Sequence, residues 1–243
     1  MTRVHTALRS GARELRRTPV LLGLLVFAPA YVIYLFTLVA PEGIAVVHVG
    51  GETLQAPLEE AFPAFTTPMT AALLSGITGL FLMHSSAVAD SRLVVAGYRA
   101  HQVILARLGL LLGIAAVATT VSVGVMLTAF DPAHVGWFVL GTGLTALSYG
   151  MVGVIAGVVL ARITGVYLIL FGSMIDLFIF QNPLATDPPE TARFLPGHYP
   201  LQVAMEAGFT GSVGLGAIGW AVLYIVVLTA VATGAFYREM RVT

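Results

Sequence analysis

The sequence predicts an all-α membrane protein that crosses the bilayer with six helices. Three observations lead to this prediction. Of the 243 residues, 58% are hydrophobic and only 10% are charged; long apolar runs follow one another along the chain; and the basic residues gather between alternate runs. Soluble domains carry about 25% charged residues, so this chain has too little charge to cover a surface in water. Its mean hydropathy of +0.92 agrees with a lipid environment.

Residues 1–18 are expected to form an amphipathic helix on the cytoplasmic membrane surface. Apolar side chains such as Val4 and Leu8 recur at helical spacing, and arginines occupy most of the other face. Such a helix lies in the membrane interface with its arginines near lipid phosphates. The arginines that we expect to have this role are Arg9, Arg13, Arg16 and Arg17.

Residues 19–243 are expected to form the transmembrane domain. A helix needs roughly 20 apolar residues to cross the hydrocarbon core, and the apolar runs are about that long or longer. Thr18-Pro19 is a typical start for the first span, which Pro29 should kink. The predicted spans are 19–40, 66–86, 103–130, 135–160, 163–181 and 213–237.

The placement of arginine predicts the orientation. With the N-terminus inside, all arginines except Arg193 fall in cytoplasmic segments, and most acidic residues fall outside. Because positive charge is enriched in cytoplasmic loops, we expect a multi-pass plasma-membrane protein with both ends in the cytoplasm.

Two outer connections are too long to be simple turns. Residues 41–65 contain IAVVHVGG, a possible short hairpin, followed by Glu59 and Glu60. Residues 182–212 begin with proline-rich, polar sequence and become amphipathic from Leu195. Since backbone that enters lipid without spanning it must be covered by protein, we expect one or two short helices here that pack on the outer ends of spans five and six.

The cytoplasmic connection between spans two and three is polar and helical in period, with Gly97 interrupting it. One interpretation is a short helix, 88–101, that inserts into a cleft on a partner protein. The other is an ordinary solvated loop that obeys the positive-inside rule. The charged and aromatic residues that would make the contact are Asp90, Arg92, Tyr98, Arg99 and His101.

Asp176 is the most informative single residue, because it lies inside the fifth apolar run. An acid there costs roughly 2.5–3.5 kcal/mol on insertion scales, and such residues usually face a cavity, a partner or a proton path. Ser173, one turn earlier, is placed to hydrogen-bond it. Asp176 and Ser173 are therefore candidates for a translocation pathway, with a structural polar contact between helices as the alternative.

Several kinds of chemistry are excluded. The chain has no cysteine, so it has no disulfides or thiolate metal sites. Its histidines lack metal-ligand spacing, no nucleophile-elbow sequence occurs, and there is no phosphate-binding loop and no lysine. We therefore expect a transport subunit rather than an enzyme, with no catalytic or metal site and no affinity for nucleic acid. Glycine pairs inside the spans, at Gly76/Gly79, Gly109/Gly113 and Gly153/Gly157, favour close helix packing.

The arrangement resembles the ABC-2 type transporter permeases, the membrane subunits of ATP-driven exporters for drugs, lipids and polysaccharides. The resemblance covers the full chain and rests on three features: the arginine-rich N-terminal segment ending in RRTP, the polar connection ADSRLVVAGYRAHQVILARL, and the outer segment FLPGHYPLQVAMEAG. Many members of that family have a stretch close to E-R-E-x-G-T in the cytoplasmic connection, where this chain has only Asp90-Ser91-Arg92.

This resemblance implies a dimer of permeases, of identical or different chains, with separate ATP-binding cassette subunits that bind ATP and magnesium. It also implies that residues 88–101 act as the coupling helix and that residues 195–210 form outer helices above the pathway. The expected cargo is hydrophobic or amphiphilic. Two other functions are weighed against this one: a self-contained proton-coupled carrier that uses Asp176, and a membrane-embedded enzyme.

Overall fold

The computed structural model describes residues 19–95, 100–185 and 189–242. The expected interfacial helix, with Arg9, Arg13, Arg16 and Arg17, lies outside the described residues, as do Tyr98 and Arg99. Within the described part, five helices are long and apolar enough to cross a membrane, which indicates a multi-pass membrane protein. They are α3 (Leu58–Val95), α4 (Ala100–Met126), α5 (Val135–Val159), α6 (Arg162–Ser173) with its continuation η1 (Met174–Phe180), and α8 (Leu215–Val242).

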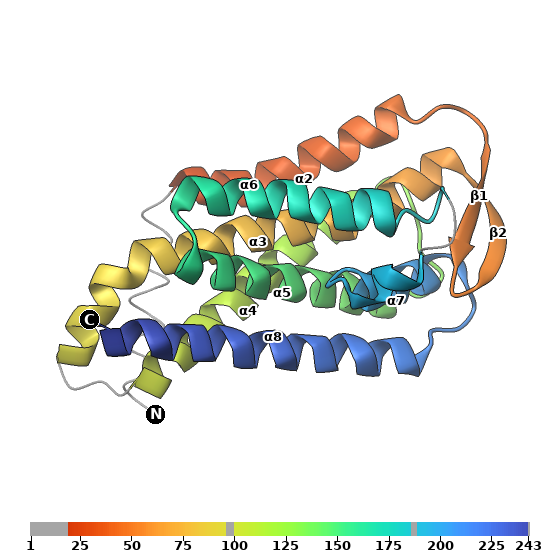
Figure 1. Ribbon diagram of the computed structural model, residues 1–243. Coiled ribbons are helices and arrows are strands. Elements are labelled where there is room, and N and C mark those ends of the chain that lie inside the picture. Colours follow the sequence, from red (N-terminus) through yellow and green to blue (C-terminus); the bar gives the residue numbers. More distant parts are fainter. Residues whose placement is uncertain (1–18, 96–99, 186–188, 243) are drawn as a thin grey trace.

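A further apolar helix, α2 (Pro19–Val39), runs alongside α3 and contains Pro29. Successive long helices run in alternating directions (Figure 1). One end of the molecule holds the start of α2, the end of α3, the start of α4, the α5–α6 connection and the end of α8. The other end holds a hairpin and a short helix, α7 (His198–Phe209). Below, these ends are called the α3–α4 end and the hairpin end.

The helix α3 is much longer than the predicted span 66–86. It begins at Leu58, so the last part of the expected outer connection, 41–65, is helical, with Glu59 and Glu60 in the first turn. Negative charge is favourable there because the first turn is the positive end of the helix dipole. At its other end α3 continues to Val95, past residue 86, the predicted end of the span. In contrast, α4 ends at Met126, short of the predicted residue 130, in a turn.

The contact between α3 and α5 depends on glycine, as the sequence predicted for two of the three pairs. A Cβ atom added to Gly79 would lie 2.5 Å from the carbonyl oxygen of Gly150, and one added to Gly153 would overlap the backbone of Gly76. Gly157 is likewise too close to Leu80 for a side chain. Small residues let the two backbones approach closely, the usual basis of helix packing in lipid.

A two-stranded antiparallel hairpin, β1 (Ile44–Val49) and β2 (Glu52–Pro57), follows α2 and confirms the expected hairpin. Its turn is Gly50-Gly51, with φ of +61° and +82°. Positive φ at both central residues is typical of a type I′ turn, whose twist suits a tight hairpin. The amide of His48 donates a hydrogen bond to the carbonyl of Pro183 (2.8 Å), which ties the hairpin to the segment after η1.

The segment between η1 and α8 forms a 3-10 turn, η2 (Glu190–Phe194), and the helix α7. Short helices were expected here. However, α7 does not lie on the surface, because most of its residues are buried and it packs along α5 and α8. A Cβ atom on Gly141 of α5 would lie 2.5 Å from the backbone nitrogen of Ala204, so α7 is wedged into the bundle and shares its main hydrophobic core.

Candidate functional site

Asp176 lies in the first turn of η1, where the α-helical winding of α6 changes to π-helical winding. The residue is 4% exposed. Its Oδ2 atom accepts hydrogen bonds from the hydroxyl of Tyr149 on α5 and from the amide of Gly197 (2.9 Å). Its Oδ1 atom accepts a bond from Nε2 of Gln181 (3.2 Å). Both carboxylate oxygens are therefore bonded, and Asp176 connects three separate segments.

Gln181 extends this network to η2 and α7. Its backbone amide donates to the carbonyl of Asp176 (2.9 Å), the i to i+5 bond of a π-helix. Its side-chain Nε2 also donates to the carbonyl of Ala192 in η2 (3.0 Å), and its Oε1 lies 2.8 Å from Nδ1 of His198. Since an amide oxygen can only accept, His198 carries a proton on Nδ1 in this arrangement. A continuous chain of contacts thus runs from the buried carboxylate to α7.

The hydrogen bond expected between Ser173 and Asp176 does not form. The Ser173 hydroxyl is buried but donates to the carbonyl of Ile169 (2.6 Å), one turn earlier in its own helix. This bond is the usual choice for serine in an apolar helix, because the i−4 carbonyl is always within reach. Tyr149, Gln181 and Gly197 supply the donors instead.

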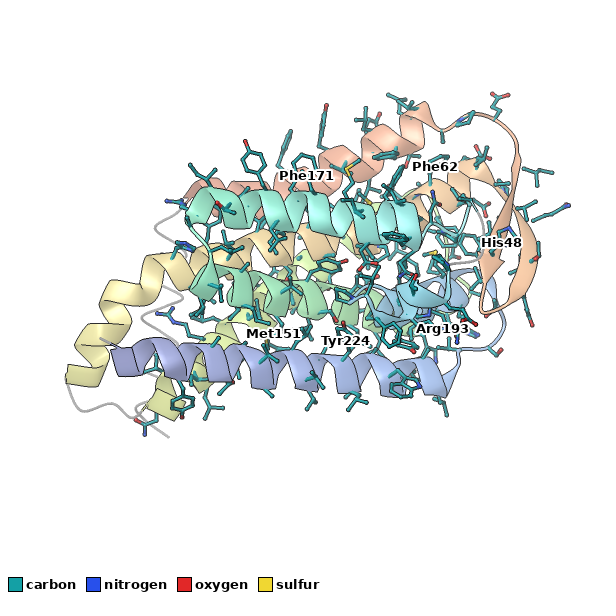
Figure 2. The ribbon with its side chains drawn as sticks, in the orientation of Figure 1. His48, Phe62, Met151, Phe171, Arg193 and Tyr224 are labelled. Atoms are coloured by element: carbon teal, nitrogen blue, oxygen red, sulfur yellow. The ribbon has the colours of Figure 1, made fainter. Side chains whose placement is uncertain are left out.

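A cavity of about 520 Å³ opens at the hairpin end, next to this network. It lies between the hairpin turn, the segment after η1, the 3-10 turn η2 and α7. Figure 2 shows two of its residues, His48 and Arg193, at this end of the molecule. Its polar side chains are His48, Gln181, Arg193, His198 and Gln202. This volume lies within the range of pockets that hold small molecules.

The described lining of this cavity contains an arginine and two histidines but no acid. Burial, and after it the positive charge of Arg193, lowers the pKa of His198 below its ordinary value. The neighbouring Tyr199 stacks on Trp220 of α8, with ring centroids 5.8 Å apart. The cavity therefore has a positive wall and borders an aromatic pair.

Glu206, on α7, holds the hairpin end together. Its Oε1 accepts a bond from Nε2 of Gln202 (2.7 Å), and its Oε2 accepts one from the amide of Gly214 (2.7 Å), just before α8. The same carboxylate lies against the hairpin turn, since a Cβ on Gly50 would be 2.8 Å from Oε1. Glu206 is 7% exposed. It is therefore a buried acid that contacts the hairpin turn, another residue of α7 and the residue just before α8.

The predicted coupling residues lie at the α3–α4 end. Asp90 and Arg92 fall on the part of α3 that extends beyond its apolar segment, and His101 falls in the first turn of α4. Asp176 lies in a different element, η1, whose continuation leads to the hairpin end. A scan against models of protein families gives no match, and no curated protein sequence matches the chain.

Four residues of the Asp176 network were missed by sequence reasoning: Tyr149, Gln181, Gly197 and His198. Each carries a weak local signal. Tyr149 is the one tyrosine of α5, Gln181 ends the apolar run, and the other two follow Leu195-Pro196. These signals mark polar positions, but they do not show which positions meet.

Proposed function

We propose that this protein is the transmembrane subunit of an ATP-driven exporter, with six spans, α2 being the first, and both chain ends in the cytoplasm. The α3–α4 end is then cytoplasmic and the hairpin end faces outward. This assignment agrees with the arginine distribution along the sequence. ATP would be bound by a separate cassette subunit, because the chain has no phosphate-binding loop.

The observation that carries the proposal is the extension of α3. The apolar span predicted from the sequence ends at residue 86, but the helix continues to Val95, roughly 14 Å farther at 1.5 Å per residue. In Figure 1 this end of α3 projects past the ends of α5 and α6. A helix that continues past its apolar span is suited to transmit movement from a partner to the spans, since α3 also makes the most extensive contact with α5.

The hairpin end supports the same function. There, the Asp176 network joins the end of span five to α5 and to the start of α7, and Glu206 joins α7 to the entrance of α8. We expect these contacts to keep the outer side closed at rest. Export would then require the cytoplasmic subunit to pull α3 and α5 enough to loosen them.

Site-specific photocrosslinking tests the proposal. Arg92 is replaced by the photoreactive residue p-benzoylphenylalanine, and the chain is co-expressed with its native neighbouring genes. The matched control carries the same replacement at Asp131, an exposed position between α4 and α5 at the opposite end. We expect irradiation to link position 92, but not 131, to an ATPase with a Walker motif.

A second variant tests whether the side chains of Asp90 and Arg92 contribute to binding of the ATPase. Asp90→Ala with Arg92→Ala should reduce the amount of ATPase that co-purifies, while the thermal stability of the permease stays unchanged. If an intact, co-expressed ATPase never links to position 92 and never co-purifies, the exporter proposal is wrong.

One observation favours a second function, a proton-coupled carrier. The contacts from His198 through Gln181 to Asp176 join the outer cavity to a buried carboxylate. This carrier would move its substrate without ATP in vesicles under a pH gradient, and Asp176→Asn would abolish the pH dependence. Transport that needs ATP and keeps its pH dependence in Asp176→Asn would exclude it.

A further inference from the structure

We infer that residues 215–224, the part of α8 nearest the hairpin, form a lateral gate. When this part swings away from η2 and α7, the cavity at the hairpin end opens to the bilayer, while the rest of α8 stays in place. The inference deepens the proposed export function, because it gives the route by which a hydrophobic or amphiphilic cargo leaves, and it rests on that function only for this cargo. The movement itself is a property of this chain alone.

Packing holds the first part of α8 only weakly. Of the five described helices that are long and apolar enough to cross a membrane, α8 has the smallest buried share, and it lies along one side of the bundle (Figure 1). Within residues 215–224 the buried side chains are those of Ala217 and Ala221. Alanine buries little apolar area, and the free energy gained on burial scales with that area.

The second part of α8 is anchored more firmly. Ala232 is buried and, with the partly buried Leu228, belongs to an apolar cluster that includes residues of α3, α4 and α5. Between the two parts, the hydroxyl of Thr229 donates to the carbonyl of Ile225 (2.7 Å), a bond that favours bending of a helix. We therefore expect α8 to bend near this point rather than to leave the bundle as a whole.

Two side-chain contacts link the first part of α8 to the segment that precedes it. The hydroxyl of Tyr224 donates a hydrogen bond to the carbonyl of Phe194, the last residue of η2. The ring of Trp220 stacks on Tyr199 of α7, with centroids 5.8 Å apart. A hydrogen bond between helices contributes only modestly to the stability of membrane proteins, so these contacts can serve as a latch that breaks and re-forms.

The latch separates the cavity from lipid. Tyr199 lines the cavity at the hairpin end, and Trp220, which covers the ring of Tyr199, is 56% exposed. The Trp220 ring therefore stands between the cavity and the exposed side of α8. Its movement would join the cavity to the bilayer at a position where tyrosine and tryptophan are typical, the membrane–water boundary.

The latch is also connected to the buried network around Asp176. The Nε2 atom of Gln181 donates both to Oδ1 of Asp176 (3.2 Å) and to the carbonyl of Ala192 in η2 (3.0 Å). Ala192 lies two residues before Phe194, whose carbonyl accepts the bond from Tyr224. Loosening of the network, which the proposed function requires, would free η2 and with it the acceptor that holds α8.

Pulsed electron paramagnetic resonance on the purified full-length chain in lipid nanodiscs tests the gate. Because the chain has no cysteine, two introduced cysteines carry the only spin labels. Val222→Cys with Asp131→Cys gives the gate distance, from the first part of α8 to the connection between α4 and α5. Val231→Cys with Val159→Cys gives the anchor distance, from the second part of α8 to the end of α5. All four positions are exposed.

The variant Tyr224→Phe removes the latch bond and keeps the ring. We expect it to raise the population of a longer gate distance about two- to twelvefold, the factor that corresponds to one neutral hydrogen bond, and to leave the anchor distance unchanged. Adding Trp220→Ala should raise this population further. Tyr167→Phe is the matched control, since Tyr167 is an exposed tyrosine of α6, and it should keep the wild-type distances.

Three results would overturn the inference. Equal gate distances in the wild type, Tyr224→Phe and the double variant would show that these contacts do not hold a gate. An anchor distance that lengthens together with the gate distance would mean that the whole helix detaches. A distance measured in protein labelled at Val222→Cys alone would place a second copy on α8, which leaves no opening to lipid. Because no ATPase is present, a gate that opens in Tyr224→Phe stands even if no ATPase links to position 92.

Discussion

The hydroxyl of Tyr149 donates a hydrogen bond to the carboxylate of Asp176, and both residues are almost fully buried. Tyr149 lies on α5 next to the glycines that contact α3, and Asp176 lies in the first turn of the π-helix η1. The same carboxylate oxygen accepts the amide of Gly197, just before α7. The side chain of Asp176 therefore fixes the relative positions of α5, η1 and α7. This role is more specific than that of an acid whose hydrogen bonds only offset the cost of its burial.

A double-mutant cycle should detect this coupling. Tyr149→Phe removes one of the donors to Asp176 and should lower the free energy of unfolding by about 1–3 kcal/mol. Asp176→Asn should cost a similar amount, because its amide nitrogen faces a donor. We expect the double variant to lose less stability than the two single variants lose together. The difference, the interaction energy, should be about 0.5–3 kcal/mol, and reversible unfolding in mixed micelles measures it. Additive effects would show that the two side chains act independently.

The glycines between α3 and α5 should tolerate replacement by alanine far less well than a glycine whose added Cβ would meet no neighbouring atom. A Cβ on Gly153 would overlap the backbone of Gly76, whereas one on Gly113 meets nothing within 4 Å. Gly153→Ala should therefore destabilise the protein by about 1–3 kcal/mol, as overpacking does. Gly113→Ala is the matched control, and the gain in helix propensity should leave it neutral or slightly stabilised. Thermal unfolding of both variants checks this, and equal melting temperatures would contradict the close contact.

Helix bounds that depend on the local hydrophobic pattern could be predicted well from the sequence. The bounds of α2 and α5 agree with the apolar runs to within a residue, because such runs are long and have clear ends. The start of α3 was missed, since Glu59, Glu60 and Pro63 look like loop sequence. Yet acids suit a first turn, and a proline close to a helix start removes few backbone bonds.

The site was predictable only in part. Asp176 was found because an acid in an apolar run is costly wherever it lies. Its partners Tyr149, Gln181 and Gly197 come from α5, the end of η1 and the turn before α7, so only the tertiary fold brings them together. The expected bond to Ser173 failed because the helix offers serine a nearer acceptor, the carbonyl of Ile169. Local spacing cannot rank such competing partners.

The two glycines of the hairpin turn separate backbone strain from contact with Glu206. Gly50→Ala and Gly51→Ala both place a side chain at positive φ, which costs about 1–2 kcal/mol. Only at Gly50 does the new Cβ also meet Glu206 Oε1, at 2.8 Å, while Gly51 has nothing within 4 Å. We expect Gly50→Ala to be the more destabilising of the two by about 1 kcal/mol or more, because it disturbs the buried bonds of Glu206.

A third variant checks that explanation. In a Glu206→Ala background the carboxylate is gone, so Gly50→Ala and Gly51→Ala should cost the same. Thermal unfolding of the four combinations measures this. A difference that persists without Glu206 would mean that the turn geometry, and not the carboxylate, distinguishes the two positions.

The protonation of His198 should make the hairpin end sensitive to acid. Burial and the charge of Arg193 lower its pKa in the folded protein, so the unfolded chain takes up a proton at a higher pH than the folded chain does. Stability therefore rises with pH wherever the unfolded state holds the extra proton. The contribution is intact above the ordinary histidine pKa, near 6.5, and is lost progressively as the pH falls from there to the lower folded pKa.

Replacing His198 isolates this effect from the other histidines. In His198→Asn, the side-chain amide can still donate to Gln181 Oε1, as Nδ1 of His198 is placed to do at 2.8 Å, but it does not titrate. Melting temperatures between pH 7.5 and about 5 should fall less steeply for this variant than for the wild type. His134→Asn, at a site where the ring contacts the carbonyl of Gly211, serves as the control and should keep the wild-type slope. If His198→Asn and the wild type lose stability in parallel, the acid sensitivity comes from another group, and the positive wall of the cavity does not act on His198.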